Sequence, residues 1–202
     1  MKKEISFGYT PDPDDAFHLF GLETGRIHFN PSYRITFEHE HIQALNQRVL
    51  SGDIDVSAVS SVLYPQVADR YIVLPCGTSV GRGYGPVLGA LTGGLKDDLQ
   101  GRRVGVPGKD TTGYFLLKYF YRNYEAVEME YNEIIGAILD HTVDAGVLIH
   151  EELLNYQFRG IEKVCCLGER WWNETKLPLP VGLTVIKKDL GPELIREISE
   201  AL

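Results

Sequence analysis

The chain has 202 residues, of which 44% are hydrophobic and 24% are charged, and its formal net charge is −8. This length can bury a core as one large domain or as two small lobes. The acidic balance argues against a nucleic acid or an anionic membrane surface as the main partner, although a few arginines or helix N-termini can make one cleft positive. No run approaches the roughly 20 apolar residues of a membrane span, and the start of the chain shows no signal-peptide pattern. We therefore expect a cytoplasmic protein.

The cysteines agree with a reducing compartment. Cys76 stands alone, and Cys165 and Cys166 are adjacent, so the count is odd and there is no C-x-x-C motif. Adjacent cysteines rarely bridge each other, and reduced, buried thiols are the simplest interpretation.

Strand and helix signals alternate along the first part of the chain. Strands alternate with helices that start at capping residues and stop at glycines. The predicted strands are 4–9, 35–40, 54–59 and 71–74, and the predicted helices are 16–24, 42–50 and one from Ser60 or Ser61 to about Ala68. This rhythm is typical of an α/β sheet.

A glycine-rich segment, residues 77–86, interrupts the rhythm before it restarts at the apolar run 87–91. The strands predicted after it are 103–106, 127–131, 145–149, 164–167 and 181–186, and the helices are 111–122, 132–140, 151–156, 169–176 and 193–202. The glycine-rich segment and the proline-rich 177–180 enclose about 90 residues that form an α/β unit of their own. We therefore predict lobe 1 at 1–86, an inserted lobe 2 at 87–180, and a return crossover and helix at 181–202, around a central cleft.

His150 is the leading catalytic candidate. It follows the apolar run 145–149, which is typical of a strand buried on both faces. Ligands of open α/β sheets bind beyond the carboxyl ends of the strands, and an imidazole there can exchange protons near neutral pH. A histidine that only caps the following helix is the alternative.

Two loops of lobe 1 carry further candidates. The segment 10–15 holds three aspartates, more than one helix cap needs, and we expect Asp14 to hold substrate hydroxyls or a cation. The end of the third strand, Ser57, Ala58, Val59 and Ser60, offers hydroxyls and helix-start N–H groups to an anion or a hydroxyl. Serine capping alone would explain one of these hydroxyls.

In lobe 2, Thr111 and Thr112 lie where a Pro-Gly turn leads from a strand into a helix start, which suits a carboxylate or phosphate-like group. The spacing is not that of a nucleotide P-loop, and ordinary capping remains an alternative. Arg82 of the glycine-rich segment is another candidate for an anion. The segment His39-Glu40-His41 could place two imidazoles on one face of a strand, but no third ligand is in view, so we predict no metal.

Five segments together resemble the 1,4-dihydroxy-6-naphthoate synthase (MqnD) family of menaquinone biosynthesis by the futalosine pathway. They are Pro11-Asp-Pro-Asp-Asp-Ala-Phe17, Gly81-Arg-Gly-Tyr-Gly-Pro86, Val106-Pro-Gly-Lys-Asp-Thr-Thr112, Ala145-Gly-Val-Leu-Ile-His-Glu151, and Leu167-Gly-Glu-Arg-Trp-Trp172 with Leu177-Pro-Leu-Pro180.

The resemblance implies a two-lobe fold like that of type II periplasmic binding proteins, used as a cofactor-independent cytoplasmic enzyme. It implies conversion of cyclic dehypoxanthinyl futalosine, a small organic carboxylate, to 1,4-dihydroxy-6-naphthoate, with release of a three-carbon unit. His150 falls on the family's proposed base, and Ala58 to Ser60, Thr111 and Thr112 fall on its substrate contacts. The family usually has Pro-Cys-Pro-Asn-Asp in the first loop and often Thr-Lys at Ser57-Ala58, so this pocket is expected to be more acidic.

Our hypothesis is therefore a lyase-type enzyme of this pathway with His150 as general base and no cofactor. Family members add helices after the second crossover, so we expect a divergent or C-terminally shortened member. The rival is a non-catalytic cytoplasmic binding protein of the same fold for a small organic anion, and chorismate dehydratase of the same pathway is a third alternative. The role of Glu151 and the oligomeric state, including a homodimer, stay open.

Overall fold

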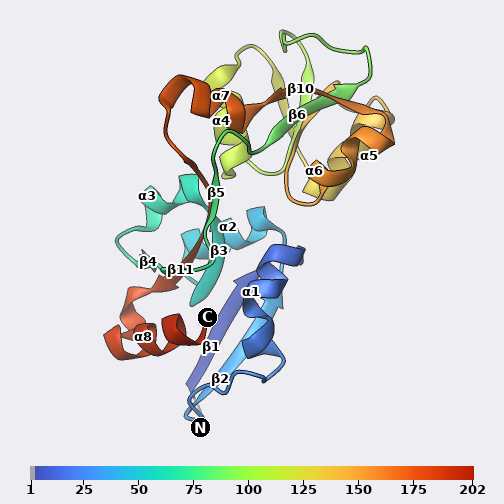
Figure 1. The fold of residues 1–202 in the computed structure, drawn as a ribbon. Coiled ribbons are helices and arrows are strands. Elements are labelled where there is room, and N and C mark those ends of the chain that lie inside the picture. The colour runs from blue at the N-terminus through green and yellow to red at the C-terminus, as the bar shows by residue number, and fades with distance from the viewer. Residues whose placement is uncertain (1–2) are drawn as a thin grey trace. The chain divides into compact units, whose positions relative to one another are not determined.

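The computed structural model describes residues 3–202, which divide into two compact units (Figure 1). Unit 1 comprises the described residues up to Ser79 together with Gly182–Leu202, and unit 2 comprises Val80–Val181. The chain passes between them in β5 (Ser79–Gly81) and in β11 (Leu179–Lys187), and these two strands pair with each other. The segment 81–86 packs within unit 2, where the Leu167 N–H donates to the Pro86 carbonyl at 2.8 Å.

The sheet of unit 1 is mixed. Its order is β2-β1-β3-β11-β4, with β1 at Lys3–Tyr9, β2 at Tyr33–His39, β3 at Val56–Ser60 and β4 at Tyr71–Val73. Strand β1 runs parallel to β2 and to β3, whereas β11 is antiparallel to β3 and β4. The carboxyl ends of β1, β2 and β3 therefore lie at one edge of this sheet.

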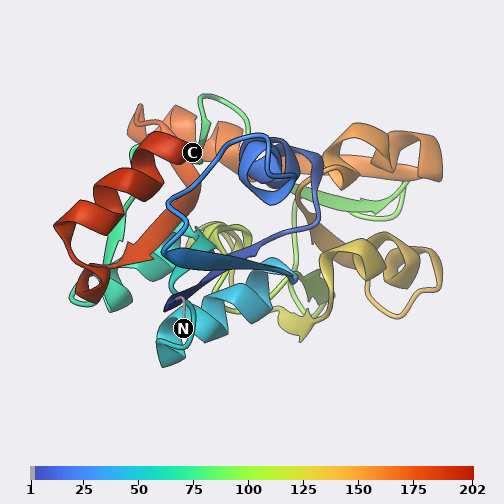
Figure 2. The same ribbon diagram turned by 90° about the horizontal axis from the view of Figure 1, so that it is seen from below.

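Helices cover both faces of the unit 1 sheet. The helices are α1 (Pro13–Glu23), α2 (Ile42–Ser51), α3 (Tyr64–Val67) and α8 (Pro192–Ala201). Leu19 of α1 and Ile198 of α8 pack with Phe7 of β1 in one core, while Leu45 of α2 packs with Val59 of β3 in another. Figure 2 shows α1 and α8 on one side of β1 and α2 on the other.

The sheet of unit 2 has five strands in the order β10-β6-β9-β7-β8. They are β6 (Val87–Leu91), β7 (Arg103–Val106), β8 (Glu125–Glu128), β9 (Ala145–Leu148) and β10 (Ile161–Cys166). Strand β7 is parallel to both β8 and β9, while β6 is antiparallel to β9 and β10. The helices are α4 (Thr112–Phe120), α5 (Ile134–Leu139), α6 (Glu152–Asn155) and α7 (Leu167–Thr175).

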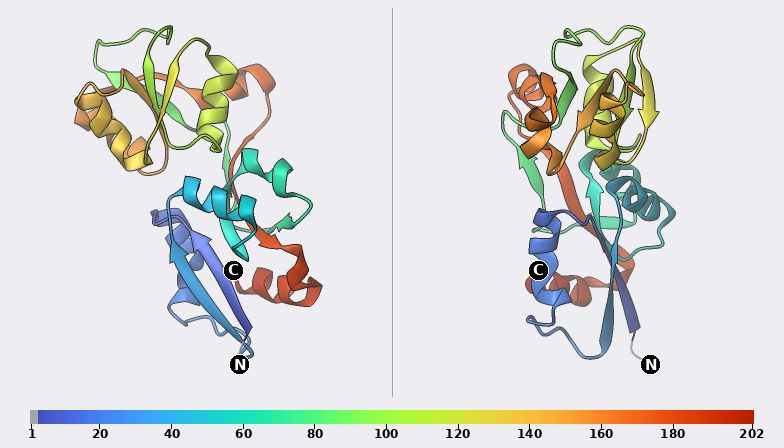
Figure 3. Two further views of the ribbon diagram at one scale, coloured as in Figure 1. Left: turned by 180° about the vertical axis from the view of Figure 1, so that it is seen from behind. Right: turned by 90° about the vertical axis from the view of Figure 1, so that its right-hand side faces the viewer.

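Helices α4 and α5 pack on opposite faces of β9. Successive side chains of a strand point to opposite faces, and Gly146 lies against Ile134 of α5, whereas Val147 lies against Gly113 of α4. The left view of Figure 3 shows strands between these helices. Strand β9 is thus buried on both sides, as the run of apolar residues predicts.

Most of the predicted elements form, with shifted ends. The strand expected at 127–131 lies earlier, as β8, Glu125–Glu128, because Tyr131 begins a 3-10 turn, Tyr131–Glu133, that Glu130 caps. The three cysteines are unbridged, as predicted, but half-buried instead of buried. Among the described residues, no helix is long and apolar enough to cross a membrane.

Candidate active site

Three loops of unit 2 follow parallel strands and therefore emerge at the same edge of the sheet. The register pairs Val106 of β7 with Glu128 of β8, and Gly105 with Gly146 of β9. The loops after these strands carry Thr111, Tyr131 and His150. Ligands of α/β sheets bind at this kind of edge, so the three loops form the candidate site of unit 2.

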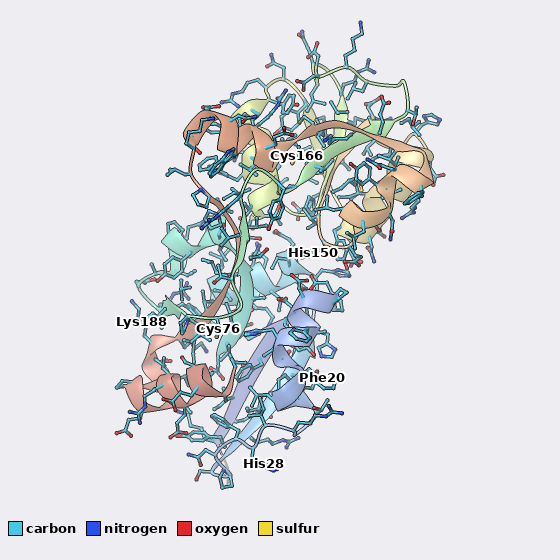
Figure 4. The ribbon with its side chains drawn as sticks, viewed as in Figure 1. Phe20, His28, Cys76, His150, Cys166 and Lys188 are labelled. Atoms are coloured by element: carbon cyan, nitrogen blue, oxygen red, sulfur yellow. The ribbon has the colours of Figure 1, made fainter. Side chains whose placement is uncertain are left out.

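His150 lies in the turn that joins β9 to α6 (Figure 4). Its φ angle is 53°, in the left-handed region that residues other than glycine rarely adopt. Its carbonyl accepts a hydrogen bond from the Leu153 N–H at 3.2 Å, and its side chain is half-buried. Strained residues of this kind cluster at functional sites.

Tyr131 links the imidazole of His150 to the carboxylate of Glu151. Its ring centroid lies 5.0 Å from that of His150, with 59° between the ring planes. Its hydroxyl donates to Glu151 Oε1 at 2.9 Å, while Glu151 Oε2 is buried without a hydrogen-bond partner. Tyr131 itself is 5% exposed. A carboxylate, an imidazole and a phenol thus lie together in one unit.

Thr111 and Thr112 begin α4, but their hydroxyl protons are engaged. Thr111 is the N-cap: its hydroxyl accepts from the Tyr114 N–H at 3.3 Å and donates to the Gly108 carbonyl at 2.7 Å. The Thr112 hydroxyl donates to the Val181 carbonyl at 2.7 Å. An anion at this helix start would therefore be held by backbone N–H groups, which lack intrahelical partners in the first turn, and not by these two hydroxyls.

The start of α4 reaches the end of β9 because residue 113 is a glycine. A Cβ added to Gly113 would lie 2.9 Å from Cγ1 of Val147 and 3.6 Å from Cγ2 of Ile149. Any larger residue would push the helix away. This close approach brings the positive end of the helix beside the strand that ends in His150.

In unit 1, the loop after β1 concentrates carboxylates around a threonine. Asp12 caps α1 by accepting from the Asp15 N–H at 3.2 Å. The Thr10 hydroxyl lies 2.6 Å from an oxygen of Asp12 and 2.6 Å from one of Asp15. Asp14 is exposed as a whole residue, but partial desolvation of its carboxyl, together with the hydrogen bond and negative charge of Asp12, raises its pKa to about 6. This loop therefore concentrates negative charge, with Asp14 in the first turn of α1.

At the end of β3, two predicted contacts have buried side chains and a third is tied to α2. Ser57 and Val59 are 0% exposed, and Ser60 is 4% exposed. Ser60 exchanges two hydrogen bonds with the fully buried Asn46 of α2, at 2.9 and 3.1 Å. Ser57 and Val59 therefore expose no surface to a ligand in this arrangement, whereas Ala58 is half-buried.

Arg82, His39 and His41 are the remaining candidates, and His39 lies at the same sheet edge as the acidic loop, as the register partner of Tyr9. Arg82 is exposed in the glycine-rich segment of unit 2. His39 pairs with Glu23 at 3.0 Å, and its ring centroid lies 4.5 Å from that of Tyr9. His41 is the N-cap of α2. Sequence reasoning missed Asn46 and Tyr131, although Tyr131 follows a strand of the same parallel set as His150 and the same rule could have found it.

The sequence of this chain matches known proteins along nearly all of its length. The family model for menaquinone biosynthesis matches residues 5–202. The chain belongs to this family. It is 36% identical over 198 residues to the 1,4-dihydroxy-6-naphthoate synthase of Thermus thermophilus, covering 98% of this chain and 71% of the relative. It is 35% identical over 204 residues to the enzyme of that name from Streptomyces coelicolor, with the same two coverages.

Solved structures confirm the predicted fold class. Protein AF1704 of Archaeoglobus fulgidus matches with a TM-score of 0.89 and 38% identity, over 98% of this chain and 73% of that one. The alkanesulfonate-binding protein SsuA of Xanthomonas axonopodis matches with a TM-score of 0.72 at 14% identity, over 98% and 71% of the two chains. This member of the menaquinone-biosynthesis family therefore has two α/β lobes like those of periplasmic binding proteins.

Proposed function

We propose that this chain converts cyclic dehypoxanthinyl futalosine to 1,4-dihydroxy-6-naphthoate, with His150 as the general base. The observation that carries the proposal is the placement of His150: it follows the carboxyl end of a buried parallel strand in a strained left-handed conformation. The identity to two named synthases supports the reaction. The half-buried imidazole keeps access to a substrate while being shielded from bulk water.

The proposed reaction needs a proton acceptor and groups that stabilise the negative charge left on the substrate by proton removal. An imidazole accepts a proton most effectively near neutral pH. The first turn of α4 supplies fixed N–H donors and the positive end of a helix beside the same strand, and such donors stabilise a developing oxyanion or a substrate carboxylate. His150 would remove the proton, and the helix start would hold the charge.

The test compares two histidines of the same unit that share an unusual backbone. His141 also has a left-handed φ of 58°, but it is exposed and follows α5. Replacing either histidine by alanine imposes a similar backbone cost. We expect His150→Ala to lower turnover by about 10²-fold or more and His141→Ala to leave it near the parental value, measured by the appearance of the naphthoate chromophore.

The same assay separates the two function classes. If His150→Ala retains near-parental turnover, His150 is not the base. If the parent protein is stabilised thermally by the futalosine compound but releases no naphthoate, the binding-protein alternative is correct. Each result contradicts a different part of the proposal.

A further inference from the structure

We propose that Tyr131 is a positioning residue with two separable tasks: its ring fixes the imidazole of His150, and its hydroxyl fixes Glu151 so that the second carboxylate oxygen meets a hydroxyl of the substrate. The inference rests on the proposed role of His150 and extends it to two residues of the same edge. Tyr131 reaches this edge from the loop after β8, whereas His150 and Glu151 come from the loop after β9.

The first task follows from the contact between the rings. The centroids of Tyr131 and His150 are 5.0 Å apart in a tilted arrangement, a geometry that aromatic rings favour. The tyrosine is 5% exposed, so its own position is set by packing. A buried ring against a half-buried imidazole restricts the rotation of that imidazole, and a displacement of about 1 Å in a catalytic group can cost about 10²-fold in rate.

The second task follows from the two oxygens of Glu151. Oε1 accepts the Tyr131 hydroxyl at 2.9 Å, which holds the carboxylate in one orientation. Oε2 is buried and has no hydrogen-bond partner. Leaving a buried acceptor unsatisfied costs about 1–3 kcal/mol, and a hydroxyl donor on a ligand would remove that cost. The ligand group that fits Oε2 is a hydrogen-bond donor such as a hydroxyl.

Two substitutions at one position separate the tasks. Tyr131→Phe keeps the ring and removes the hydrogen bond to Glu151, whereas Tyr131→Leu removes both. We expect Tyr131→Phe to raise KM about three- to tenfold with the pH profile of kcat unchanged. Tyr131→Leu should in addition lower kcat about tenfold or more and shift the pH profile of kcat.

Tyr156 is the matched control. It is 6% exposed in the core of the same unit, and its hydroxyl accepts from Gln157 Nε2 at 3.3 Å. Tyr156→Phe and Tyr156→Leu should change thermal stability while leaving KM and the pH profile as in the parent. If the Tyr131 variants change only stability, as the Tyr156 variants do, Tyr131 is an ordinary core residue and the proposal is wrong.

Two further measurements test the pair, and the second does not depend on the proposed function. Glu151→Gln should raise KM as Tyr131→Phe does, and the double variant should raise it little further, because the two residues act as one unit. The ring-proton signals of His150, assigned by their loss in His150→Ala, should move in Tyr131→Leu and stay nearly unmoved in Tyr131→Phe. If His150→Ala does not slow turnover, His150 is not the base, but the signal comparison still tests whether Tyr131 positions the imidazole. If the signals do not move in folded Tyr131→Leu, the positioning role is wrong.

Discussion

Replacing Gly113 by alanine tests whether the contact between α4 and β9 builds the site. The added Cβ would lie 2.9 Å from Cγ1 of Val147, closer than a carbon–carbon contact allows, and Val147 is a fully buried, β-branched strand residue. Overpacking of this kind costs about 1–3 kcal/mol. Alanine recovers at most about 1 kcal/mol through its helix propensity. The net expectation is a loss of about 1–2 kcal/mol, or about 3–6 °C in Tm for a chain of this size.

Gly136→Ala in α5 is the control, and its expected effect on stability has the opposite sign. An added Cβ there meets nothing within 4 Å, and the residue lies inside a helix. Gly136→Ala should therefore raise stability by up to about 1 kcal/mol. Denaturant unfolding of both variants measures the difference directly, and turnover of each measures its consequence for the site.

The functional expectation is equally specific. Gly113→Ala moves the first turn of α4 away from the strand that ends in His150, so turnover should fall about tenfold, whereas Gly136→Ala should leave turnover unchanged. A Gly113→Ala protein as stable and as active as the parent would show that the helix start does not need this close approach. The reasoning about the α4 N-terminus as part of the site would then be wrong.

Two further predictions concern the acidic loop and the threonine cap. A pKa of about 6 for Asp14, above its value of about 3.9 in an unfolded chain, means that the unfolded state ionises first as pH rises. As pH rises from about 4 to 6, the parent should therefore lose stability relative to Asp14→Asn. Because Asp14 retains contact with water, the difference in the free energy of unfolding should not exceed about 1 kcal/mol. Equal pH dependence of the two Tm values would refute this prediction. Thr111→Val should lower the free energy of unfolding by about 1 kcal/mol through loss of the N-cap. Calorimetry should show less than about threefold weakening of substrate binding, because the Thr111 hydroxyl donates its proton to the Gly108 carbonyl. A tenfold weakening would show that this hydroxyl does bind the substrate.

The sequence carried enough information for the strand that ends in His150, and less for the partners around it. Residues 145–148 are all buried, and such a short uninterrupted apolar run is typical of a strand covered on both faces. Tyr131 was expected at the end of the strand 127–131, and aromatic residues do favour strands. In the structure, the Glu130–Glu133 capping box begins a turn there instead. Local capping thus overrode strand propensity at the position where the side chain matters most.

The chemistry of individual hydroxyls was harder to predict than the location of the loops. Ser60 was expected to be available to a ligand, yet it exchanges two hydrogen bonds with Asn46, which lies fourteen residues earlier and is fully buried. The hydroxyls of Thr111 and Thr112 likewise donate to backbone carbonyls. A sequence shows which groups can donate, but their acceptors depend on the geometry of the local turn, as for Thr111, and on packing between distant segments, as for Thr112.

The backbone at His150 shows why this residue, among the histidines, stands out. Among residues 3–202, four that are not glycine adopt a left-handed φ: Asn123, His141, His150 and Lys176. Lys176 ends α7 and His141 follows α5, where this conformation is routine, and asparagine tolerates it well. His150 instead follows a strand, where capping offers no explanation, and glycine would adopt the turn at lower cost. We therefore expect the side chain of His150 to contribute something that the turn itself does not need, and its ring contact with Tyr131 points to the imidazole.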